Sequence, residues 1–371
     1  MKILYVTTIS LTMNTFFKPH IQMLTEEGNT VDIACNAKDL QLDLLYEELG
    51  CNFFQIDFSR SPLSVDNIKA YRQLKKIVEE GGYDIVHCHT PNAAVITRLV
   101  CRKIRKKNKT RVFYTAHGFH FYKGAPILNW LVYYPVEKIC SRFTDVLITI
   151  NNEDYERANA KFKTKKVYYV PGVGIDLSRF KNVKTDKNAI RREIGAPEDA
   201  VLLLSVGELN KNKNHQAIIK ALHKLDNQNI HYAIAGEGDE KDNLIRLAKE
   251  LSVEKQIHLL GYRKDVIELY YSANAFCFPS HREGLGLAAI EAMACGVPVI
   301  ASDNRGTRSF VKHLENGFLC MNNSIESYVE AIKCLLYDTK LKEHILNEAH
   351  ETVEKFSLEN ILLNMKGIYK N

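Results

Sequence analysis

The stretch FCFPSHREGLGLAAIEAMACGVPVIAS, residues 276–302, decides the fold predicted for this chain. Its apolar ends are typical of two buried strands, and the glycine-broken segment between them is typical of a turn that leads into a helix. Glu283 and Glu291 stand on either side of the expected helix start, with seven residues between them. A helix start offers unpaired N–H groups and partial positive charge, which suit a phosphate, and carboxylates accept hydrogen bonds from sugar hydroxyls. The stretch therefore predicts a site for a nucleotide sugar.

Short apolar runs alternate with helix-length amphipathic segments along the whole chain. This alternation predicts parallel sheets covered by helices on both faces, and hence an α/β protein. The runs form two series, so we expect two doubly wound, Rossmann-like domains that face a central cleft. The expected strands are 3–8, 31–35, 53–57, 85–89, 112–117, 146–150 and 167–170, followed by 201–207, 231–236, 257–261, 275–280, 297–301 and 318–320.

A chain of 371 residues fits two domains better than one. The segment VPGVGID at 170–176 ends the first series with a proline and two glycines, and the polar stretch 180–192 follows it. We therefore expect an N-terminal domain over 1–172 and a C-terminal domain over 173–355. Residues 356–371 form an amphipathic pattern with no strand after it, which predicts a final helix that crosses back to the N-terminal domain.

The composition, with 46% hydrophobic and 25% charged residues, is typical of a soluble globular protein. No apolar run is long enough to span a bilayer, and MKILYVTT enters a strand pattern with no cleavable signal segment. The nine cysteines are scattered, without a C-x-x-C pair, which favours free thiols in a reducing cytosol. These observations predict a cytoplasmic protein.

Two neighbouring segments indicate a partner surface. Residues 102–111 carry seven Lys and Arg side chains, and residues 119–143 are rich in aromatic side chains and contain Trp130, the one tryptophan of the chain. Together they predict a peripheral contact with an anionic membrane, on its cytoplasmic face. The alternatives are a solvated helix end and a buried helix. No nucleic-acid recognition motif accompanies the basic run.

The segment GELNKNKN at 207–214 follows an expected strand and precedes a helix. A lysine in this loop, Lys211 or Lys213, can therefore reach a diphosphate, and we favour Lys213; Gly207 opens the loop. In the turn after residue 280, Gly284 and Gly286 allow close backbone approach to a ligand, so that the amides of Leu285, Gly286 and Leu287 could donate to its oxygens.

Histidines mark the N-terminal half. His87 and His89 alternate on a strand and point to one side, which indicates either a structural pair or a metal site. His117 ends the next strand, where the ligands of parallel sheets bind. The first strand leads into TISLTMN without the glycines of a dehydrogenase fingerprint.

Taken together, these residues resemble the retaining glycosyltransferases of family four, which have the GT-B fold. The resemblance covers essentially the whole chain. It rests on E-G-L-G-L-x-x-x-E at 283–291 with A-x-G-x-P-V at 294–299, D-I-V-H-x-H at 84–89, T-x-H-G at 115–118 and P-G-x-G-x-D at 171–176. In detail the chain is similar to bacterial enzymes that extend lipid-linked saccharides for capsule, exopolysaccharide or O-antigen.

The resemblance implies a role for each matching residue. Glu291 would hold the ribose, Glu283 the donor sugar and Lys213 the diphosphate of a UDP-sugar, with Gal, GlcNAc, GalNAc or Glc as its sugar. His117 would face the transferred sugar, and the lipid-linked acceptor would enter near Asn14, His20 and the aromatic segment that begins at Phe119. Such enzymes need neither a metal nor another cofactor.

The chain departs from the family pattern at two places. Glu208 stands where the family commonly has arginine, so Arg282, Arg263 and Arg305 become candidates to supply the missing charge. Thr12–Thr15 replaces the usual Gly-Gly near the first strand. A UDP-sugar 2-epimerase of the same fold, a non-catalytic nucleotide-sugar-binding scaffold and a metal hydrolase built on His87 and His89 are the alternative functions.

Overall fold

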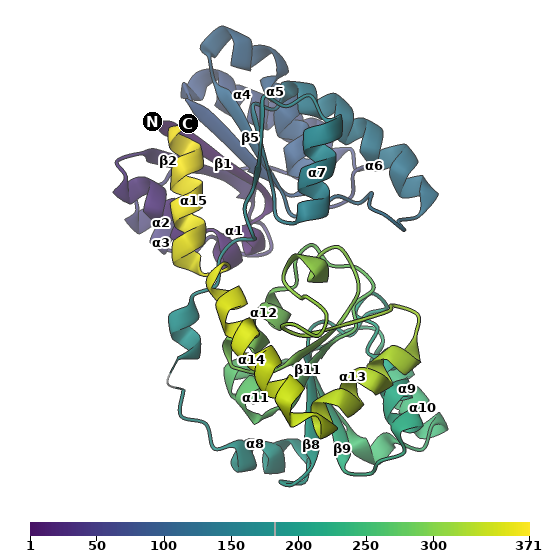
Figure 1. Ribbon diagram of the computed structural model, residues 1–371. Helices are drawn as coiled ribbons and strands as arrows, with labels where there is room; N and C mark the ends of the chain where they lie inside the picture. Colours follow the sequence, from purple (N-terminus) through teal and green to yellow (C-terminus); the bar gives the residue numbers. More distant parts are fainter. Residues whose placement is uncertain (182) are drawn as a thin grey trace. The chain divides into compact units, whose positions relative to one another are not determined.

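The computed structural model describes residues 1–181 and 183–371, which form two compact units. Unit 1 contains residues 1–173 and 361–371, and unit 2 contains residues 174–360. Asn182, in the polar stretch 180–192 that follows the expected boundary, lies outside the described residues. Figure 1 shows a sheet with helices around it in each unit.

Unit 1 is built on a parallel sheet with the order β3-β2-β1-β4-β5-β6-β7. The order reverses between β1 and β4, and this switch point is where doubly wound sheets bind ligands. The strands are β1 (Lys2–Ile9), β2 (Thr30–Asn36), β3 (Phe53–Gln55), β4 (Ile85–His89), β5 (Arg111–Ala116), β6 (Val146–Thr149) and β7 (Lys166–Tyr169).

Both faces of this sheet are buried, because side chains of β1 alternate between two cores. Leu4 and Val6 join one core, and Ile3 and Tyr5 join the other. Residues of the last helix, α15, complete the second core, and Figure 1 shows that helix beside β1 and β2. The helices are α1 (Ser10–Phe16), α2 (Lys18–Glu26), α3 (Leu45–Glu48), α4 (Asp66–Gly81), α5 (Pro91–Asn108), α6 (Ile127–Cys140), η1 (Ser141–Phe143), α7 (Asn152–Lys161) and α15 (Leu358–Lys370).

Unit 2 repeats the doubly wound plan with the order β10-β9-β8-β11-β12-β13, and its switch point lies between β8 and β11. The strands are β8 (Val201–Val206), β9 (Ile230–Ala235), β10 (Ile257–Gly261), β11 (Ala275–Phe278), β12 (Val299–Ser302) and β13 (Phe318–Cys320). The helices are η2 (Leu177–Phe180), α8 (Lys187–Ile194), α9 (Gln216–Leu225), α10 (Lys241–Glu250), η3 (Glu254–Gln256), α11 (Val266–Ser272), α12 (Leu287–Ala294), η4 (Thr307–Ser309), α13 (Ile325–Tyr337) and α14 (Thr339–Glu354).

The predicted α/β class and all the expected strands are confirmed, with differences at strand ends. β11 stops at Phe278, two residues short of the expected 280, and β12 begins at Val299, two residues after the expected 297. Pro279 and Pro298 stand at these ends, and proline has no N–H to donate to a strand ladder.

The nine cysteines are free thiols, as expected. Within residues 1–181 and 183–371, no helix is both long enough and apolar enough to cross a bilayer.

Candidate active site

The loop after β8 presents Lys213 beside the end of that strand. Gly207 opens the loop with a φ of 154°, and a Cβ at this position would stand 3.3 Å from Cε of Lys213. Glycine therefore lets the lysine side chain lie close to the backbone. The Lys213 N–H donates to Oδ1 of Asn210 at 3.0 Å, which fixes the turn of the loop.

Glu283 lies in the turn between β11 and α12, against the loop that follows β12. A Cβ on Gly306 would lie 2.8 Å from both Cβ and the carbonyl oxygen of Glu283, so only glycine allows this approach. Gly286 precedes α12 with a φ of 115°, and a Cβ there would meet the Phe278 ring at 2.8 Å. The glycines of this region thus serve the close packing that sets the position of Glu283.

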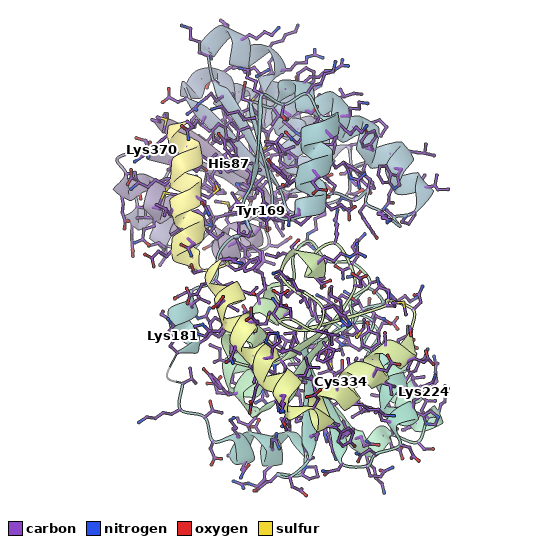
Figure 2. All side chains as sticks on the ribbon, viewed as in Figure 1. His87, Tyr169, Lys181, Lys224, Cys334 and Lys370 are labelled. Atoms are coloured by element: carbon purple, nitrogen blue, oxygen red, sulfur yellow. The ribbon has the colours of Figure 1, made fainter. Side chains whose placement is uncertain are left out.

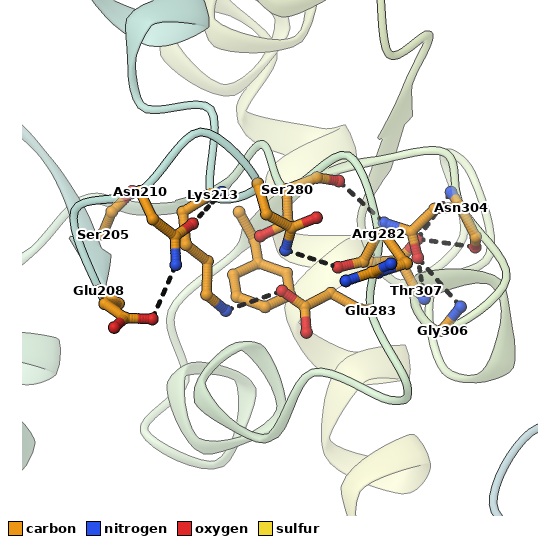
Figure 3. Close-up of polar contacts among 12 residues, drawn as sticks. Ser205, Glu208, Asn210, Lys213, Ser280, Arg282, Glu283, Asn304, Gly306 and Thr307 are labelled. Atoms are coloured by element: carbon orange, nitrogen blue, oxygen red, sulfur yellow. Dashed lines mark hydrogen bonds and ion pairs between the residues drawn. The ribbon is translucent and has the colours of Figure 1, made fainter. Parts of the chain in front are cut away.

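Lys213 and Glu283 form an ion pair, with 2.7 Å between Nζ and Oε1. Figure 3 shows the two side chains pointing toward each other from their loops. Their side chains are 21% and 14% exposed, and Nζ lies 4.9 Å from the centroid of the Phe278 ring. The pair is thus held in place and still reachable by a ligand. A lysine can bind a phosphate, and a carboxylate can accept hydrogen bonds from sugar hydroxyls.

Three loops at this edge of the sheet are joined by hydrogen bonds of main-chain and amide groups. The His281 N–H donates to the carbonyl oxygen of Asn212 at 2.8 Å, and Nδ2 of Asn212 donates to the carbonyl oxygen of Arg282 at 3.0 Å. From the loop after β12, Nδ2 of Asn304 donates to the carbonyl oxygen of Ser280 at 3.0 Å. The ion pair therefore stands on a fixed support at the switch point of unit 2 (Figure 3).

Glu291 lies on α12, and the Tyr270 hydroxyl of α11 donates to its Oε2 at 3.0 Å. Burial raises the pKa of the Glu291 carboxyl, while the hydrogen bond from Tyr270 and the charge of Arg179 oppose the rise. The predicted donor residues Gly284, Leu285, Gly286 and Leu287 occupy the turn before α12 and its first position.

The three candidate arginines differ in their surroundings. Arg263, after β10, donates to Asp265 and to Glu193 and is held by these two carboxylates, which raise its pKa. Arg282 is exposed and directly precedes Glu283, and Arg305 is buried beside Gly306. Of the three, Arg282 and Arg305 lie next to residues of the Glu283 turn. Glu208 is exposed and accepts a hydrogen bond from Nδ2 of Asn210 at 2.7 Å.

In unit 1, His117 follows β5 and belongs to a buried aromatic cluster. Its Nε2 lies 3.3 Å from Nδ1 of His89, and its ring lies 6.0 Å from that of Phe17. Burial, together with the repulsion of a charge on His20, lowers the pKa of His117 to about 4. The ring is therefore neutral near pH 7.

His87 and His89 point to one side of β4, as predicted, with their ring centroids 4.1 Å apart. Both nitrogens of His87 have protein partners, the hydroxyls of Tyr369 and Thr115. Figure 2 marks His87 within unit 1. No group of three or more His, Cys, Asp or Glu side chains among the described residues is arranged to hold a metal ion. This geometry favours the structural interpretation of the pair.

The structure places the three expected acceptor residues in different surroundings. Asn14 donates to the carbonyl oxygen of Gln41 and accepts from the N–H of Asp43, which engages its amide within the fold. His20 is buried, with Nε2 2.8 Å from the carbonyl oxygen of Val173. Phe119 is also buried, but it lines a cavity of unit 1.

Several residues of these sites were missed at the level of sequence. Asn304 has a local signal, because asparagine in a polar segment after a strand commonly caps its own turn, and its Oδ1 accepts from the N–H of Gly306 at 3.0 Å. Tyr270 and Tyr369 carry no such signal. Each meets its partner through a contact between residues far apart in the chain.

Two family models match the chain, one in each of its two units. Residues 2–151 match the family model described as glycosyl transferase 4-like, and residues 186–352 match the model described as glycosyl transferases group 1.

Two relatives span nearly all of the chain. Putative glycosyltransferase EpsD of Bacillus subtilis (strain 168) is 37% identical over 375 residues, covering 99% of this chain and 96% of the relative. The UDP-Gal:alpha-D-GlcNAc-diphosphoundecaprenol alpha-1,3-galactosyltransferase of Escherichia coli is 25% identical over 355 residues, covering 94% and 90%.

Among solved structures, Anabaena Alr3699/HepE in complex with UDP and glucose matches with a TM-score of 0.79 and 18% identity, over 100% of this chain and 99% of that one. At this identity the match establishes a shared fold.

Proposed function

The chain belongs to the group 1, family-four-like glycosyltransferases of the GT-B fold, and on that premise we propose that it moves a sugar from a UDP-sugar to a lipid-linked saccharide. The sugar is of the Gal, GlcNAc, GalNAc or Glc type, its anomeric configuration is retained, and the product serves the synthesis of a surface polysaccharide such as capsule or exopolysaccharide. The E. coli relative supports this choice, because its name states a UDP-sugar donor and a diphosphoundecaprenol acceptor.

One observation carries the proposal: the pair of Lys213 and Glu283 at the switch point of unit 2. When the donor binds, Lys213 turns to the diphosphate, and Glu283 accepts hydrogen bonds from the sugar. Glu291 holds the ribose, with Tyr270 orienting its carboxylate. The amides of the turn before α12 face the leaving diphosphate, and Arg282 or Arg305 supplies the further charge that Glu208 does not.

In the reaction, the acceptor hydroxyl attacks the anomeric carbon on the face from which UDP departs. The bond to the diphosphate oxygen breaks, and that oxygen takes the hydroxyl proton. Lys213 and the helix amides stabilise the charge that develops on the leaving group, so the proposal needs no metal. His117, neutral near pH 7, faces the transferred sugar as a hydrogen-bonding group.

The test is a donor screen with purified protein, using UDP-glucose, UDP-galactose, their N-acetyl forms and GDP-mannose. We expect one UDP-sugar to raise the melting temperature and to be hydrolysed slowly without acceptor. Stabilisation by no nucleotide sugar would contradict the donor assignment. Binding without turnover under any acceptor would favour a scaffold subunit, which Glu208 at the diphosphate site also fits. Release of an isomerised sugar without acceptor would favour the 2-epimerase.

We also propose that unit 1 binds the cytoplasmic face of an anionic membrane. Helix α6 exposes an apolar row with Ile127 at 77%, Leu131 at 68% and Ile139 at 53% exposure. The basic end of α5 lies against η1, which directly follows α6, because Nη1 of Arg105 donates to the carbonyl oxygen of Arg142 at 3.3 Å. An apolar row next to a basic patch fits an interfacial surface.

This surface is tested by vesicle co-sedimentation with phosphatidylglycerol. A triple change of the exposed Lys103, Lys106 and Lys107 to Glu should weaken binding at least roughly 100-fold, since each Lys near such a surface contributes about 1 kcal/mol. The matched control changes three exposed lysines of unit 2, Lys241, Lys333 and Lys340, to Glu. Equal effects of the two triple variants, or indifference to salt, would contradict the proposal.

A further inference from the structure

A cavity of about 560 Å³ lies in unit 1 between the segment before α4, helix α5 and helix α6. This volume falls within the range of about 300–1,000 Å³ that is usual for small-molecule sites. Most of its lining is apolar, and its inner wall reaches Phe119 and Phe121 after β5. Its apolar lining includes Leu63, Val95, Ile96, Phe121, Val132 and Val136.

The rim of this cavity is exposed and apolar on two sides. Leu63, from the segment before α4, is 93% exposed, and Val132 of α6 is 48% exposed. Val132 and Val136 also belong to the exposed face of α6 that carries Leu128 and Leu131. Apolar side chains thus lead without a break from the outer surface of α6 into the cavity.

A second cavity, of about 340 Å³, continues the first, because both are lined by Pro62, Pro91, Asn92, His120 and Tyr133. The second cavity is more polar. It lies at the switch point of unit 1, where Thr8 of β1 and Thr90 after β4 contact each other through their hydroxyls at 2.7 Å.

The polar cavity also carries a positive charge. The Arg60 side chain is exposed and lines it, and no acidic side chain among the described residues forms an ion pair with it. Nδ2 of Asn92 donates to the carbonyl oxygens of Ser59 and Arg60, which fixes the backbone beneath this arginine. An anionic group in this cavity would meet the Arg60 guanidinium, which can donate to phosphate oxygens, while the Thr90 hydroxyl already donates to the carbonyl oxygen of His89.

We propose that these two cavities form one groove for the lipid of the acceptor, a polyprenyl diphosphate. The first isoprenoid units lie in the apolar cavity, with the chain continuing past Leu63 and Val132 into the bilayer. The diphosphate lies near Arg60 and Thr90, so that the saccharide stands at the carboxyl ends of β1 and β4. This inference rests on the proposed function and adds to it the segment of chain that recognises the lipid.

The chemistry of the groove selects this occupant. A free saccharide would leave the apolar cavity wet, and a nucleotide sugar would place polar groups against Val95 and Ile96, which costs free energy without hydrogen bonds. A phospholipid also has an apolar chain and an anionic head group, but its binding to a membrane surface requires no cavity at the switch point of a sheet. An isoprenoid diphosphate matches both halves and reaches the sheet edge.

The test compares two tryptophan substitutions on α5. Val95 is half-buried and lines the apolar cavity, while Leu99, one turn further along, is 38% exposed and does not line it. We expect Val95→Trp to lower kcat/KM at least tenfold for a polyprenyl-diphosphate-linked saccharide. The same variant should match the unchanged protein with an acceptor whose lipid is a short, water-soluble alkyl chain. Leu99→Trp should behave as the unchanged protein with both acceptors, and UDP should raise the melting temperature of all three proteins equally.

Direct binding separates the groove from the reaction. In calorimetric titration, farnesyl diphosphate should bind the full chain more tightly than farnesol or inorganic diphosphate. In Arg60→Ala, farnesyl diphosphate should bind no more tightly than farnesol. In Val95→Trp, it should bind no more tightly than inorganic diphosphate. These binding results do not depend on sugar transfer. If they are obtained and no transfer is found, the proposed function is contradicted while the groove is supported.

Three results would overturn the groove. The first is full activity of Val95→Trp with the polyprenyl acceptor. The second is an equal loss with both acceptors, which would assign the cavity to the saccharide. The third is tighter binding of phosphatidylglycerol vesicles than of farnesyl diphosphate, with both lost in Val95→Trp, which would make the cavity a membrane anchor.

Discussion

The switch points of the two units have the same topology and opposite chemistry. In unit 2, β8 and β11 end in loops that bring Lys213 and Glu283 together as a charged, ligand-accessible pair. In unit 1, β1 and β4 end beside threonines, neutral histidines and a largely apolar groove. On our two proposals, one doubly wound plan would serve a charged, water-soluble donor in one unit and a lipid in the other. The difference lies in the loops, because the strands next to the two switch points, β1 and β4 in unit 1 and β8 and β11 in unit 2, are buried alike.

The two units also use ion pairs differently. Arg98 and Glu137 form a bidentate pair in unit 1, with bonds of 2.7 and 3.1 Å, and Arg98 is only 1% exposed. We expect Arg98→Ala to lower the free energy of unfolding by about 3–5 kcal/mol, because it leaves the Glu137 carboxylate buried and unpaired. Urea unfolding measures this. The control is Arg192→Ala, which removes an exposed pair with Glu198 and should cost less than about 1 kcal/mol. Equal losses of unfolding free energy in Arg98→Ala and Arg192→Ala would contradict the expectation that the buried pair contributes more to stability than the exposed one.

In unit 2, breaking the pair of Lys213 and Glu283 should change turnover more than stability. We expect Lys213→Ala and Glu283→Gln each to lower kcat/KM for the best UDP-sugar by roughly 100-fold or more, since each changes a group that we propose contacts the donor. The unfolding free energies of both variants should fall by less than that of Arg98→Ala, because the Lys213 and Glu283 side chains are 21% and 14% exposed while Arg98 is 1% exposed. Lys312→Ala, which removes an exposed pair with Glu315, is the control for loss of a lysine. Rates near those of the unchanged protein in both variants would refute the site.

The histidine cluster makes unit 1 sensitive to acid. Burial lowers the pKa values of His20, His87, His89 and His117, the last to about 4. A folded state that binds fewer protons than the unfolded chain loses stability as pH falls from about 6.5 toward the folded pKa, by about 1.4 kcal/mol per pH unit for each neutral histidine.

The fluorescence of Trp130 reports the unfolding of unit 1 and not that of unit 2, because the only tryptophan of the chain lies in unit 1. Its fluorescence at fixed urea should therefore fall steeply between pH 6.5 and 4. His89→Phe, which removes one titrating ring and keeps the aromatic contacts with Tyr5 and Phe17, should shift the midpoint to lower pH. A midpoint that does not move would show that the cluster does not set the acid stability.

The smallest expected effects come from two glycines. Gly286→Ala places a Cβ at a φ of 115° and 2.8 Å from the Phe278 ring, so we expect a loss of about 1–3 kcal/mol in stability and weaker UDP binding. Gly367→Ala, on the exposed face of α15 with no atom within 4 Å of the new Cβ, should instead stabilise by about 0.5–1 kcal/mol. Thermal unfolding with and without UDP measures both. A neutral Gly286→Ala would mean that the turn relaxes.

The candidate site of unit 2 could be predicted from the sequence, whereas the groove of unit 1 could not, and the reason is physical. The strands and the Glu283 turn follow from neighbouring residues, since buried strands and glycine-broken turns leave local patterns. The groove of unit 1 is assembled from segments near residues 62, 95 and 132, which lie far apart in the chain and none of which indicates a cavity by itself. Contacts of this kind, like those of Asn14 and His20, depend on tertiary packing. Position in the chain alone therefore does not show which residues line such a groove.

The last helix has a consequence for biosynthesis. Ile361, Met365 and Tyr369 of α15 fill the second core of unit 1, and the Tyr369 hydroxyl contacts His87. A ribosome makes these residues after all of unit 2, so nascent unit 1 waits with an incomplete core while the second half of the chain emerges and folds. Domains usually fold in order of synthesis, from the N-terminus. In this chain unit 2 can complete its folding before unit 1. A premature stop codon that removed only α15 would therefore expose the core of unit 1, although most of unit 1 is encoded at the start of the gene.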